Sequence, residues 1–509
     1  MRRTFPAASA AAFLLACLLS AAVSRPALAQ TLRIGLREDP DLLDPALSGS
    51  YVGRIVFAGM CDKLFDYDSK LDLVPRLATG YEYKDPTHLV LHLRPGVRFQ
   101  DGEKLDAQAV KYTLTRDLTM KGSLRRGEIN AIGTIEVIDP LTVELELKAP
   151  SSPLLAQFTD RAGMILPPKY VEEKQDKFGL APVCSGPFKF VERVQQDRIV
   201  LDRFPGYWNA GAIHLDRVIY LPTPNAAVRL ANLQAGAFDL VEQILPTDVP
   251  AVQKDPKLKL AIDDSLMYEG ITFNTDNGPA SKTVIGQNAL VRRAFELAID
   301  RTALIKVVYN GMFAPTAQAN PPSSPYYDQS IQPPPRDVDQ AKALLKQAGV
   351  TLPVPVTLTI QNNSDIQQAG QVIQAMANEA GFDVKLRTME FASSLQAGYA
   401  GQFEAYLIGW SGRSDPDGNM WQFLHTTGTF NYGHYSNPDV DKWLDDARLI
   451  TDQEQRKADY HNVWVQERKD MPLVYLWVPK NIVGMRKEVN GFVQVPDGLI
   501  RLQGITISK

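Results

Sequence analysis

Val356-Thr357-Leu358-Thr359-Ile360 decides the fold class of this chain. Its alternating β-branched and apolar residues predict a buried strand. A helical pattern over residues 365–380 follows and stops at Gly381, and residues 384–386 predict a second strand. A strand, a helix and a strand in this order form a βαβ unit, whose two strands run parallel with a right-handed crossover. Residues 403–410 predict another buried strand, so this half of the chain has an α/β pattern.

The first half of the chain favours antiparallel strands instead. In Thr142-Val143-Glu144-Leu145-Glu146-Leu147 the apolar residues share one face and the glutamates share the other, as in a half-buried antiparallel strand. Residues 188–191 and 198–201 predict a hairpin. Further strands are predicted over 32–36, 88–93 and 218–221, and helices over 51–65, 223–235, 288–299, from Arg301 and from Val338, with Asp300 and Asp337 as caps of the last two; residues 315–335 are proline-rich and irregular.

Composition indicates a globular protein with more than one core. The chain has 509 residues, 45% of them hydrophobic and 22% charged, which predicts two or three sub-domains. The formal net charge is −4, and it becomes −7 when the three arginines of the first 29 residues are left out. A mildly acidic chain without a basic run is a poor nucleic-acid binder, because phosphate neutralisation needs clustered Lys and Arg.

The first 29 residues predict an export signal. Two arginines, an apolar run over residues 7–23 and Ala27-Leu28-Ala29 fit a secretion signal cleaved after Ala29, which would leave Gln30 first. The apolar run is short for an uncleaved membrane anchor. Leu14-Leu15-Ala16-Cys17 resembles a lipoprotein box and Arg2-Arg3-Thr4-Phe5 a twin-arginine signal, and both stay open as alternatives. We expect ordinary secretion to the periplasm.

Two cysteines remain after the predicted cleavage, because Cys17 leaves with the signal. In an exported protein a pair of cysteines predicts a disulfide, here between Cys61 and Cys184. Two free buried thiols are the alternative.

Enzyme motifs are missing from the sequence. It has no phosphate-binding G-x-x-x-x-G-K-[S/T] loop and no H-E-x-x-H, and Gly409-Trp410-Ser411-Gly412-Arg413 lacks the last glycine of a nucleophile elbow. His88 and His92 share a strand face but have no third metal ligand nearby. The adjacent pairs Asp263-Asp264 and Asp445-Asp446 point different ways and make poor acid–base pairs. We therefore expect neither catalysis nor a metal or other cofactor.

Several stretches, in the same order along the chain, resemble the family that binds peptides, opines and nickel complexes for ABC importers, the bacterial extracellular solute-binding proteins of family 5. These stretches are Leu73–Ala78, Leu91–Gly102, Val183–Phe188, Arg203–Trp208, Leu233–Asp239, Val291–Arg301, Gly409-Trp410 and Tyr435–Asp439. Cys184 departs from the family's usual glycine, which suits a disulfide.

The resemblance implies a two-lobed periplasmic-binding-protein clamp of α/β class with mixed sheets, similar to class II. The first lobe would comprise residues 30–72, 184–276 and 477–509, an inserted sub-domain residues 73–183, and the second lobe residues 277–476. The ligand, a small molecule or a peptide, would bind between the lobes, which close by hinge motion. The partner would be the inner-membrane permease of an ABC transporter, and the protein would act as a monomer.

The loop after the 403–410 strand is the first place to look for ligand contacts, since ligands bind beyond the carboxyl ends of strands in open α/β sheets. Peptide-binding relatives usually carry an aspartate there, which pairs with the peptide's α-amino group. Here Arg413 falls at about that position, which reverses the preferred ligand charge and favours a carboxylate or phosphate. An arginine that points to solvent or pairs with Asp415 or Asp417 is the alternative. Asp415, in the family's D-P element, is a further expected ligand contact, and a helix cap is the alternative for it.

Further ligand contacts are expected from the aromatic and amide residues that the resemblance places near the cleft. They are Trp410, Tyr51, Tyr268, Asn274, Asn431 and Tyr432. A packing role is the alternative for each of them.

Three functions remain open from the sequence: a binding protein without turnover, an exported hydrolase of peptide or cell-wall substrates, and a signalling or chaperone role. Dipeptides, oligopeptides, opines, glutathione-like thiol peptides and sugar conjugates all remain as ligands. Nickel and haem are less favoured, because the six histidines are not clustered.

Overall fold

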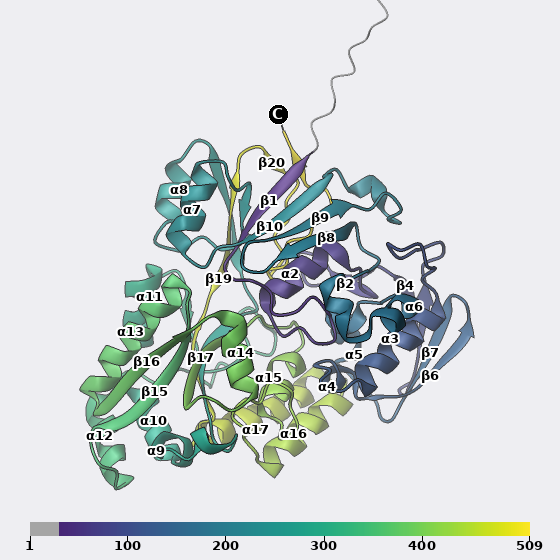
Figure 1. Ribbon diagram of the computed structural model, residues 1–509. Coiled ribbons are helices and arrows are strands. Elements are labelled where there is room, and N and C mark those ends of the chain that lie inside the picture. The colour runs from purple at the N-terminus through teal and green to yellow at the C-terminus, as the bar shows by residue number, and fades with distance from the viewer. Residues whose placement is uncertain (1–29, 509) are drawn as a thin grey trace, which may run out of the picture.

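The structure is a computed structural model that describes residues 30–508. The predicted signal peptide and Cys17 therefore lie outside the described residues. Three larger sheets, each with its own helices, organise the chain, and β1 (Thr31–Leu36) begins close to the C-terminal end of the chain (Figure 1).

A seven-stranded mixed sheet forms the first lobe, in the order β12-β19-β11-β1-β10-β9-β8. β1 pairs in parallel with β10 and β11, while β8 and β9 form the predicted antiparallel hairpin. Its strands are β1, β8 (Phe188–Val194), β9 (Arg198–Arg203), β10 (Arg217–Pro222), β11 (Leu240–Val241), β12 (Leu258–Asp264) and β19 (Lys480–Arg486), and its helices are α2 (Tyr51–Met60), α7 (Ala226–Gln234) and α8 (Val249–Lys254).

A four-stranded antiparallel sheet, in the order β4-β5-β7-β6, forms the inserted sub-domain beside the first lobe (Figure 1). Val143, Leu145 and Leu147 are buried on one face of this sheet, as the period-2 pattern predicts. The elements are β4 (Ala78–Asp85), β5 (His88–Leu93), β6 (Ile132–Asp139), β7 (Thr142–Leu147), α3 (Ala107–Thr119), α4 (Arg126–Ile129), α5 (Leu154–Gln157), η1 (Arg161–Gly163), α6 (Pro168–Lys174) and η2 (Gln175–Leu180).

A six-stranded mixed sheet, in the order β14-β18-β13-β17-β15-β16, forms the second lobe. The predicted βαβ unit is confirmed, because β15 and β16 run parallel and α13 connects them. The strands are β13 (Tyr268–Phe273), β14 (Ala314–Pro315), β15 (Val354–Gln361), β16 (Phe382–Met389), β17 (Ala405–Trp410) and β18 (Leu473–Val478). β13 pairs with β17 and β18 in this sheet, although the sequence-based boundary at residue 277 leaves it with the first lobe.

Helices surround the second sheet in Figure 1. They are η4 (Pro279–Ser281), α9 (Val284–Gln287), α10 (Ala289–Ala298), α11 (Arg301–Tyr309), α12 (Val338–Gln347), α13 (Ser364–Glu379), α14 (Phe391–Tyr399), α15 (Asp417–Leu424), α16 (Pro438–Leu449) and α17 (Gln453–Asp470). Small pieces complete the chain: the ladder of β2 (Phe65–Tyr67) with β3 (Leu73–Pro75), the ladder of β20 (Val489–Asn490) with β21 (Thr506–Ile507), and η3 (Ala210–Ala212).

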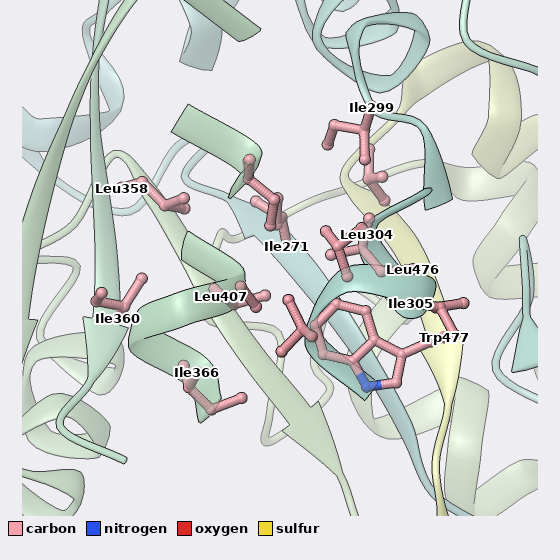
Figure 2. Packing of buried hydrophobic residues seen from close by; sticks show 14 of the residues in the cluster. Ile271, Ile299, Leu304, Ile305, Leu358, Ile360, Ile366, Leu407, Leu476 and Trp477 are labelled. Carbon is pink, nitrogen blue, oxygen red and sulfur yellow. The ribbon is translucent and has the colours of Figure 1, made fainter. Parts of the chain in front are cut away.

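A continuous apolar core fixes the second sheet against its helices. Ile271, Leu358 and Leu407, from three neighbouring strands, pack with Leu304 of α11 and with Trp477 of β18 (Figure 2). All of them are buried, and burial of a side chain of this size stabilises the fold by about 1.5–3 kcal/mol. This core holds β13 and β17 rigid, and both strands border the site described below.

Helix boundaries follow local chemistry. Asp300 and Asp337 accept hydrogen bonds from backbone N–H groups in the first turns of α11 and α12, as predicted. The helix predicted over 51–65 ends earlier, at Met60, because Cys61 is extended. The helix predicted from 223 begins at Ala226 with Asn225 as its cap, since Pro224 disfavours a helical residue before it.

The chain passes between the first and second lobes at two adjacent places. Residues 265–267 connect β12 to β13, and Pro479 connects β18 to β19. Ser265 ties the two crossings together, since its Oγ donates to the Pro479 carbonyl at 2.7 Å and accepts from the Met267 N–H at 3.2 Å.

A disulfide joins Cys61, at the end of α2, to Cys184, before β8, with the two Cα atoms 4.9 Å apart. Gln100 of the inserted sub-domain brackets this bridge: its N–H donates to the Cys184 carbonyl and its Oε1 accepts from the Cys184 N–H. The bridge therefore lies where the first lobe and the inserted sub-domain meet.

Residues 30–508 contain no helix that is long and apolar enough to cross a membrane. Within the same range, no group of three or more His, Cys, Asp or Glu side chains is placed to hold a metal ion.

Candidate functional site

A cavity lies between the two lobes. The first lobe contributes the loop after β1 and the start of α2, and the second lobe contributes β13, β17 and the surrounding helices. The lining residues are Arg37, Glu38, Gly49, Tyr51, Met267, Tyr268, Glu269, Thr272, Gln361, Phe391, Leu395, Ile408, Gly409, Trp410, Ser411, Phe423, Tyr432 and Leu473.

Aromatic side chains form much of the cavity wall. The expected residues Trp410, Tyr51, Tyr268 and Tyr432 all line it. Trp410 lies against Phe423, with ring centroids 4.9 Å apart, and its indole N–H donates to Asn419 Oδ1. The Tyr51 hydroxyl donates to the Gly498 carbonyl at 2.8 Å. These contacts fix the rings, so the cavity is preformed.

Arg413 is buried beside the cavity wall and does not pair with Asp415 or Asp417. Its Nη2 lies 2.8 Å from Oδ2 of Asp160 in the inserted sub-domain, and its Nη1 donates to the Gly412 carbonyl. The guanidinium carbon lies 4.5 Å from the centre of the Trp410 ring, a cation–π contact. Arg413 therefore connects the second lobe to the sub-domain.

Asp160 gathers three more arginines around Arg413. Arg54 Nε lies 2.8 Å from Asp160 Oδ2, and Arg161 Nε lies 3.5 Å from Oδ1. Arg161 and Arg125 both donate to the Ser48 carbonyl, and Arg125 also pairs with Glu128. We call this group the arginine cluster: Arg54, Arg125, Arg161 and Arg413 with Asp160 and Glu128.

Positive charge exceeds negative charge in the arginine cluster, because four guanidinium groups meet two carboxylates and all six side chains are buried. Arg161 Nη2 and Arg125 Nε find no hydrogen-bond partner among the described residues. Burial holds the pKa of the nearby Asp117 carboxyl well above the usual value, which disfavours its charged form.

The pKa shifts reflect this crowding. Burial, with repulsion from Arg54, lowers the pKa of Arg413 to about 9, and burial, with repulsion from Arg125, lowers that of Arg161 to about 10. Burial alone would raise the pKa of Asp160, but Arg413 and Arg54 outweigh it and hold that pKa well below the usual value. The cluster is therefore an electropositive region in which a further negative charge relieves repulsion.

Ser411 connects the arginine cluster to the cavity. Its Oγ accepts from Arg54 Nη1 at 3.0 Å and from Arg413 Nη1 at 3.3 Å, and the residue lines the cavity. A hydroxyl oxygen has two lone pairs and one proton. Since both lone pairs face guanidinium groups, the hydroxyl proton is left to donate to a third partner.

The cavity also has an acidic end, which the sequence interpretation did not anticipate. Glu38 follows β1 and Glu269 lies in β13; they are 4% and 6% exposed, and both line the cavity. Burial raises the pKa of Glu38 to about 8, and burial raises that of Glu269 to about 7, although Arg37 opposes both shifts. The rule that ligands bind beyond strand carboxyl ends identifies Glu38 when it is applied to β1.

The other expected contacts serve the protein's own structure. Asp415 forms a two-pronged ion pair with Arg456 of α17, at 2.8 and 2.9 Å. The Asn274 side-chain amide donates to the carbonyls of Asn277, Gly401 and Phe403. Asn431 donates to the His425 and Tyr435 carbonyls. The structure places none of the three in the cavity wall.

The cavity lining offers binding chemistry. It contains one serine, Ser411, and no histidine, cysteine or lysine that would activate a nucleophile. Aromatic faces, an acidic end at Glu38 and Glu269, and a basic end where Ser411 contacts the arginine cluster are features that orient a bound molecule.

Comparison with known proteins agrees with this geometry. Residues 72–431 match the profile of the "Bacterial extracellular solute-binding proteins, family 5 Middle". The chain is 28% identical over 481 residues to the glutathione-binding protein GsiB of Pectobacterium atrosepticum, with 92% of each chain covered.

Two solved structures share the whole fold. The binding protein AgaA of A. tumefaciens R10, in complex with agropinic acid, superposes with a TM-score of 0.86 at 27% identity and covers 94% of this chain and 99% of its own. The periplasmic binding protein DppA of Helicobacter pylori, in complex with the peptide STSA, has a TM-score of 0.86 at 26% identity and covers 94% and 98%.

These findings confirm the resemblance drawn from the sequence motifs and the predicted mixed-sheet clamp. The family consists of extracellular and periplasmic binding proteins that serve ABC transport, and its members are not enzymes. A cavity between two lobes, lined by aromatic and charged side chains, is the kind of site that such a function needs. This chain belongs to the bacterial extracellular solute-binding proteins of family 5.

Proposed function

We propose that this protein captures a peptide-like or other small solute with an anionic group in the cavity between its lobes and delivers it to an ABC permease in the inner membrane. The observation that carries the proposal is the position of Ser411 in the cavity wall. The Ser411 hydroxyl accepts from Arg54 and Arg413 of the arginine cluster, which leaves its proton to donate to a bound solute.

A carboxylate at this wall would complete the charge balance of the arginine cluster. Buried charges are costly unless paired, and the cluster carries more cations than anions. Arg413 would then stabilise the anionic group through Ser411 and through its field, while keeping its own ion pair with Asp160. Trp410, Tyr51, Tyr268 and Tyr432 would pack against the body of the solute.

The similar proteins indicate which chemical class of solute to test first. Glutathione and agropinic acid, named for two of the similar proteins, both carry carboxylates. Glutathione is also a peptide with a free ammonium, so it is the first candidate solute for this chain. A phosphorylated sugar would suit the basic end but would leave the acidic end unused.

The test is calorimetric titration of the mature protein, refolded once to remove carried-over ligand. The probes are glutathione, trialanine, agropinic acid, glucose 6-phosphate and the C-terminal amide of trialanine. We expect binding of one or more carboxylate probes, and weaker binding of the amide than of trialanine. Equal affinity for trialanine and for its amide would contradict the role of Ser411 as the contact for a carboxylate. Conversion of any probe to product would contradict a pure binding function.

Variants separate the anion contact from general damage. Arg413→Ala and Ser411→Ala should each weaken the binding of the best carboxylate probe. The loss should be roughly 10-fold or more, because hydrogen bonds to charged groups are worth about 1.5–3 kcal/mol. Arg217→Ala, which removes an exposed arginine paired with Asp202, is the matched control and should leave the dissociation constant unchanged. Unchanged affinity in Arg413→Ala would refute the part assigned to that residue.

The remaining sequence-based assignments are part of the same proposal. The first lobe would comprise residues 30–72, residues 184–276 without β13, and residues 477–509. The inserted sub-domain would comprise residues 73–183, and the second lobe residues 277–476 together with β13. The mature protein would be a periplasmic monomer cleaved after Ala29. The Gln30 N–H donates to Asp216 Oδ2 at 2.8 Å, so the first residue left by this cleavage would be held to the first lobe by a hydrogen bond. Intact mass of the secreted protein checks the cleavage site, and light scattering checks the monomer.

A further inference from the structure

We propose that Glu38 and Glu269 form a subsite for an ammonium group, so that the solute lies along the cavity with its cationic end at these glutamates and its carboxylate at Ser411. This inference rests on the proposed function and adds the orientation and minimum length of the solute.

The two glutamates come from opposite lobes and meet in one cavity. Glu38 belongs to the loop after β1, and Glu269 belongs to β13. Glu269 stands directly opposite Gly409 in the β13–β17 ladder, where a Cβ atom would come within 2.5 Å of Glu269 Oε1. The absence of a side chain at Gly409 is therefore what lets this carboxylate lie over the strand at the cavity wall.

One carboxylate oxygen of the pair is buried without a hydrogen-bond partner. Glu38 Oε2 is buried and has no hydrogen-bond partner among the described residues, although its residue lines the cavity. Leaving a buried acceptor unpaired is unfavourable. A cationic donor in the cavity would satisfy it.

The surroundings of the pair are acidic on every side. Arg37, Glu242, Glu269 and Glu390 act electrostatically on Glu38, and Arg37 and Asp365 act on Glu269. Arg37 is shared among Glu38, Glu242, Glu269 and Asp365, and Arg229 lies beyond Glu242. Two arginines thus face five carboxyl groups, so ionisation of Glu38 and Glu269 together is unfavourable unless a further cation is present.

Tyrosines also face this end, but they do not add charge. Burial raises the pKa of Tyr51, Tyr309 and Tyr406 above the usual tyrosine value, so all three stay neutral near pH 7. The carboxyl groups therefore set the charge to which a ligand responds.

The two charged ends of the cavity are separated along one strand. Glu269 lies over Gly409, whereas Ser411 follows two residues later, which corresponds to roughly 7 Å at about 3.3 Å per residue. The ammonium and carboxylate of a free amino acid share one carbon atom and cannot reach both ends. An extended peptide spans about 3.3–3.6 Å per residue, so the solute needs at least two residues.

This arrangement inverts the chemistry expected for the loop after β17. Arg413 occupies about the position at which peptide-binding relatives usually have an aspartate, and the negative charge lies instead on Glu38 and Glu269. The amino group of a bound peptide would accordingly lie away from Arg413, toward β1 and β13.

Protonation follows from binding at such a site. An ammonium placed between Glu38 and Glu269 favours their ionised forms. Binding near pH 7 should therefore release protons to the solvent.

The experiment is a titration of the wild-type protein and of Glu38→Gln and Glu269→Gln with glutathione and N-acetylglutathione, and in parallel with trialanine and N-acetyltrialanine. We expect each substitution to weaken binding of the free amines roughly 10- to 100-fold and to change binding of the acetylated probes little. Glu144→Gln, whose side chain pairs with Lys84 on the sub-domain, is the control and should match the wild type.

A second readout uses the wild type alone, in case a variant does not fold. The calorimetric heat in buffers of different ionisation enthalpy gives the protons exchanged on binding, and the free amines should release more than the acetylated probes. Equal proton exchange, or equal losses for free and acetylated probes in the variants, would overturn the subsite. If neither glutathione nor trialanine binds the wild type while another carboxylate does, the ammonium subsite is refuted and the anion site stands; if no carboxylate probe binds, the proposed function itself fails.

Discussion

Arg413 Nη2 and Asp160 Oδ2 lie 2.8 Å apart and join the second lobe to the inserted sub-domain. The same carboxylate oxygen lies 2.8 Å from Arg54 Nε of the first lobe. One aspartate therefore holds all three parts of the protein at a single point beside the cavity.

Replacement of Asp160 by Asn should destabilise the protein strongly. It would leave the four guanidinium groups of the arginine cluster with Glu128 alone, and removal of one partner from a buried ion pair typically costs about 3–5 kcal/mol. Urea unfolding at neutral pH measures the loss. Asp202→Asn, at an exposed pair with Arg217, is the control and should change the free energy of unfolding by less than about 1 kcal/mol. Equal stability of the two variants would contradict the central role of Asp160.

Gly412→Ala should disturb the cavity wall. Gly412 has a φ of +70°, and an added Cβ would lie 1.9 Å from the Leu266 carbonyl oxygen, which is backbone and next to the lobe crossing. We expect a loss of more than about 1 kcal/mol in stability and weaker ligand binding, because the loop bearing Ser411 and Arg413 must move. Gly211→Ala, where the added atom meets nothing within 4 Å, serves as the control in both thermal unfolding and titration. A Gly412→Ala protein with wild-type affinity would show that the loop conformation is not needed.

Loss of the disulfide should lower stability without changing the site. Cys61 and Cys184 are 123 residues apart in sequence, and closing a loop of that length is worth about 4–5 kcal/mol in the chain-entropy model. Cys61→Ser/Cys184→Ser should therefore unfold at lower denaturant concentration, yet bind the same solute with an unchanged dissociation constant while folded, since neither residue lines the cavity. An unchanged denaturation midpoint would mean that the bridge does not form in the secreted protein.

The pH dependence of stability should carry the signature of Glu38 and Glu269. Their folded pKa values, about 8 and about 7, lie above the ordinary value of 4.5, because burial disfavours the charged form. Between pH 4.5 and 8 the unfolded chain binds fewer protons than the folded protein, so these groups make stability fall as pH rises, by about 1.4 kcal/mol per unit of pKa displacement at most.

Glu38→Gln/Glu269→Gln tests this sign. The double variant should gain stability relative to the ligand-free wild type as pH increases from 5 to 8, measured by urea unfolding at each pH. Glu144→Gln provides the comparison with a glutamate that lies outside the cavity and pairs with Lys84, and it should show no such trend. A constant difference between double variant and wild type across this range would exclude raised pKa values for the pair.

Local patterns predicted the elements well, because strands, helices and caps depend on neighbouring residues. The βαβ unit and the caps at Asp300 and Asp337 are examples. The pairing of β19 with β11 and β12 is different, since it brings the end of the chain back to the first lobe. No periodicity in the sequence encodes such a return, and only the family resemblance implied it.

The residues of the candidate site were likewise predicted only where a local sequence signal exists. Four aromatic residues were predicted because they stand in or near motifs, and they line the cavity. Arg413 was recognised, but its partner Asp160 comes from another part of the chain and carries no local signal. Glu38 was overlooked because an acidic, proline-containing turn looks like a surface loop, and its burial depends on the approach of the second lobe.

The two crossings that Ser265 ties together have a consequence for delivery. Two crossings that lie side by side favour rotation of the lobes about a single hinge axis. The angle between the lobes would then be the main change at the outer surface, whichever solute is bound. A partner that contacted both lobes would detect a bound solute from this angle alone. The residues that bind the solute and the surface that such a partner would contact could therefore evolve separately.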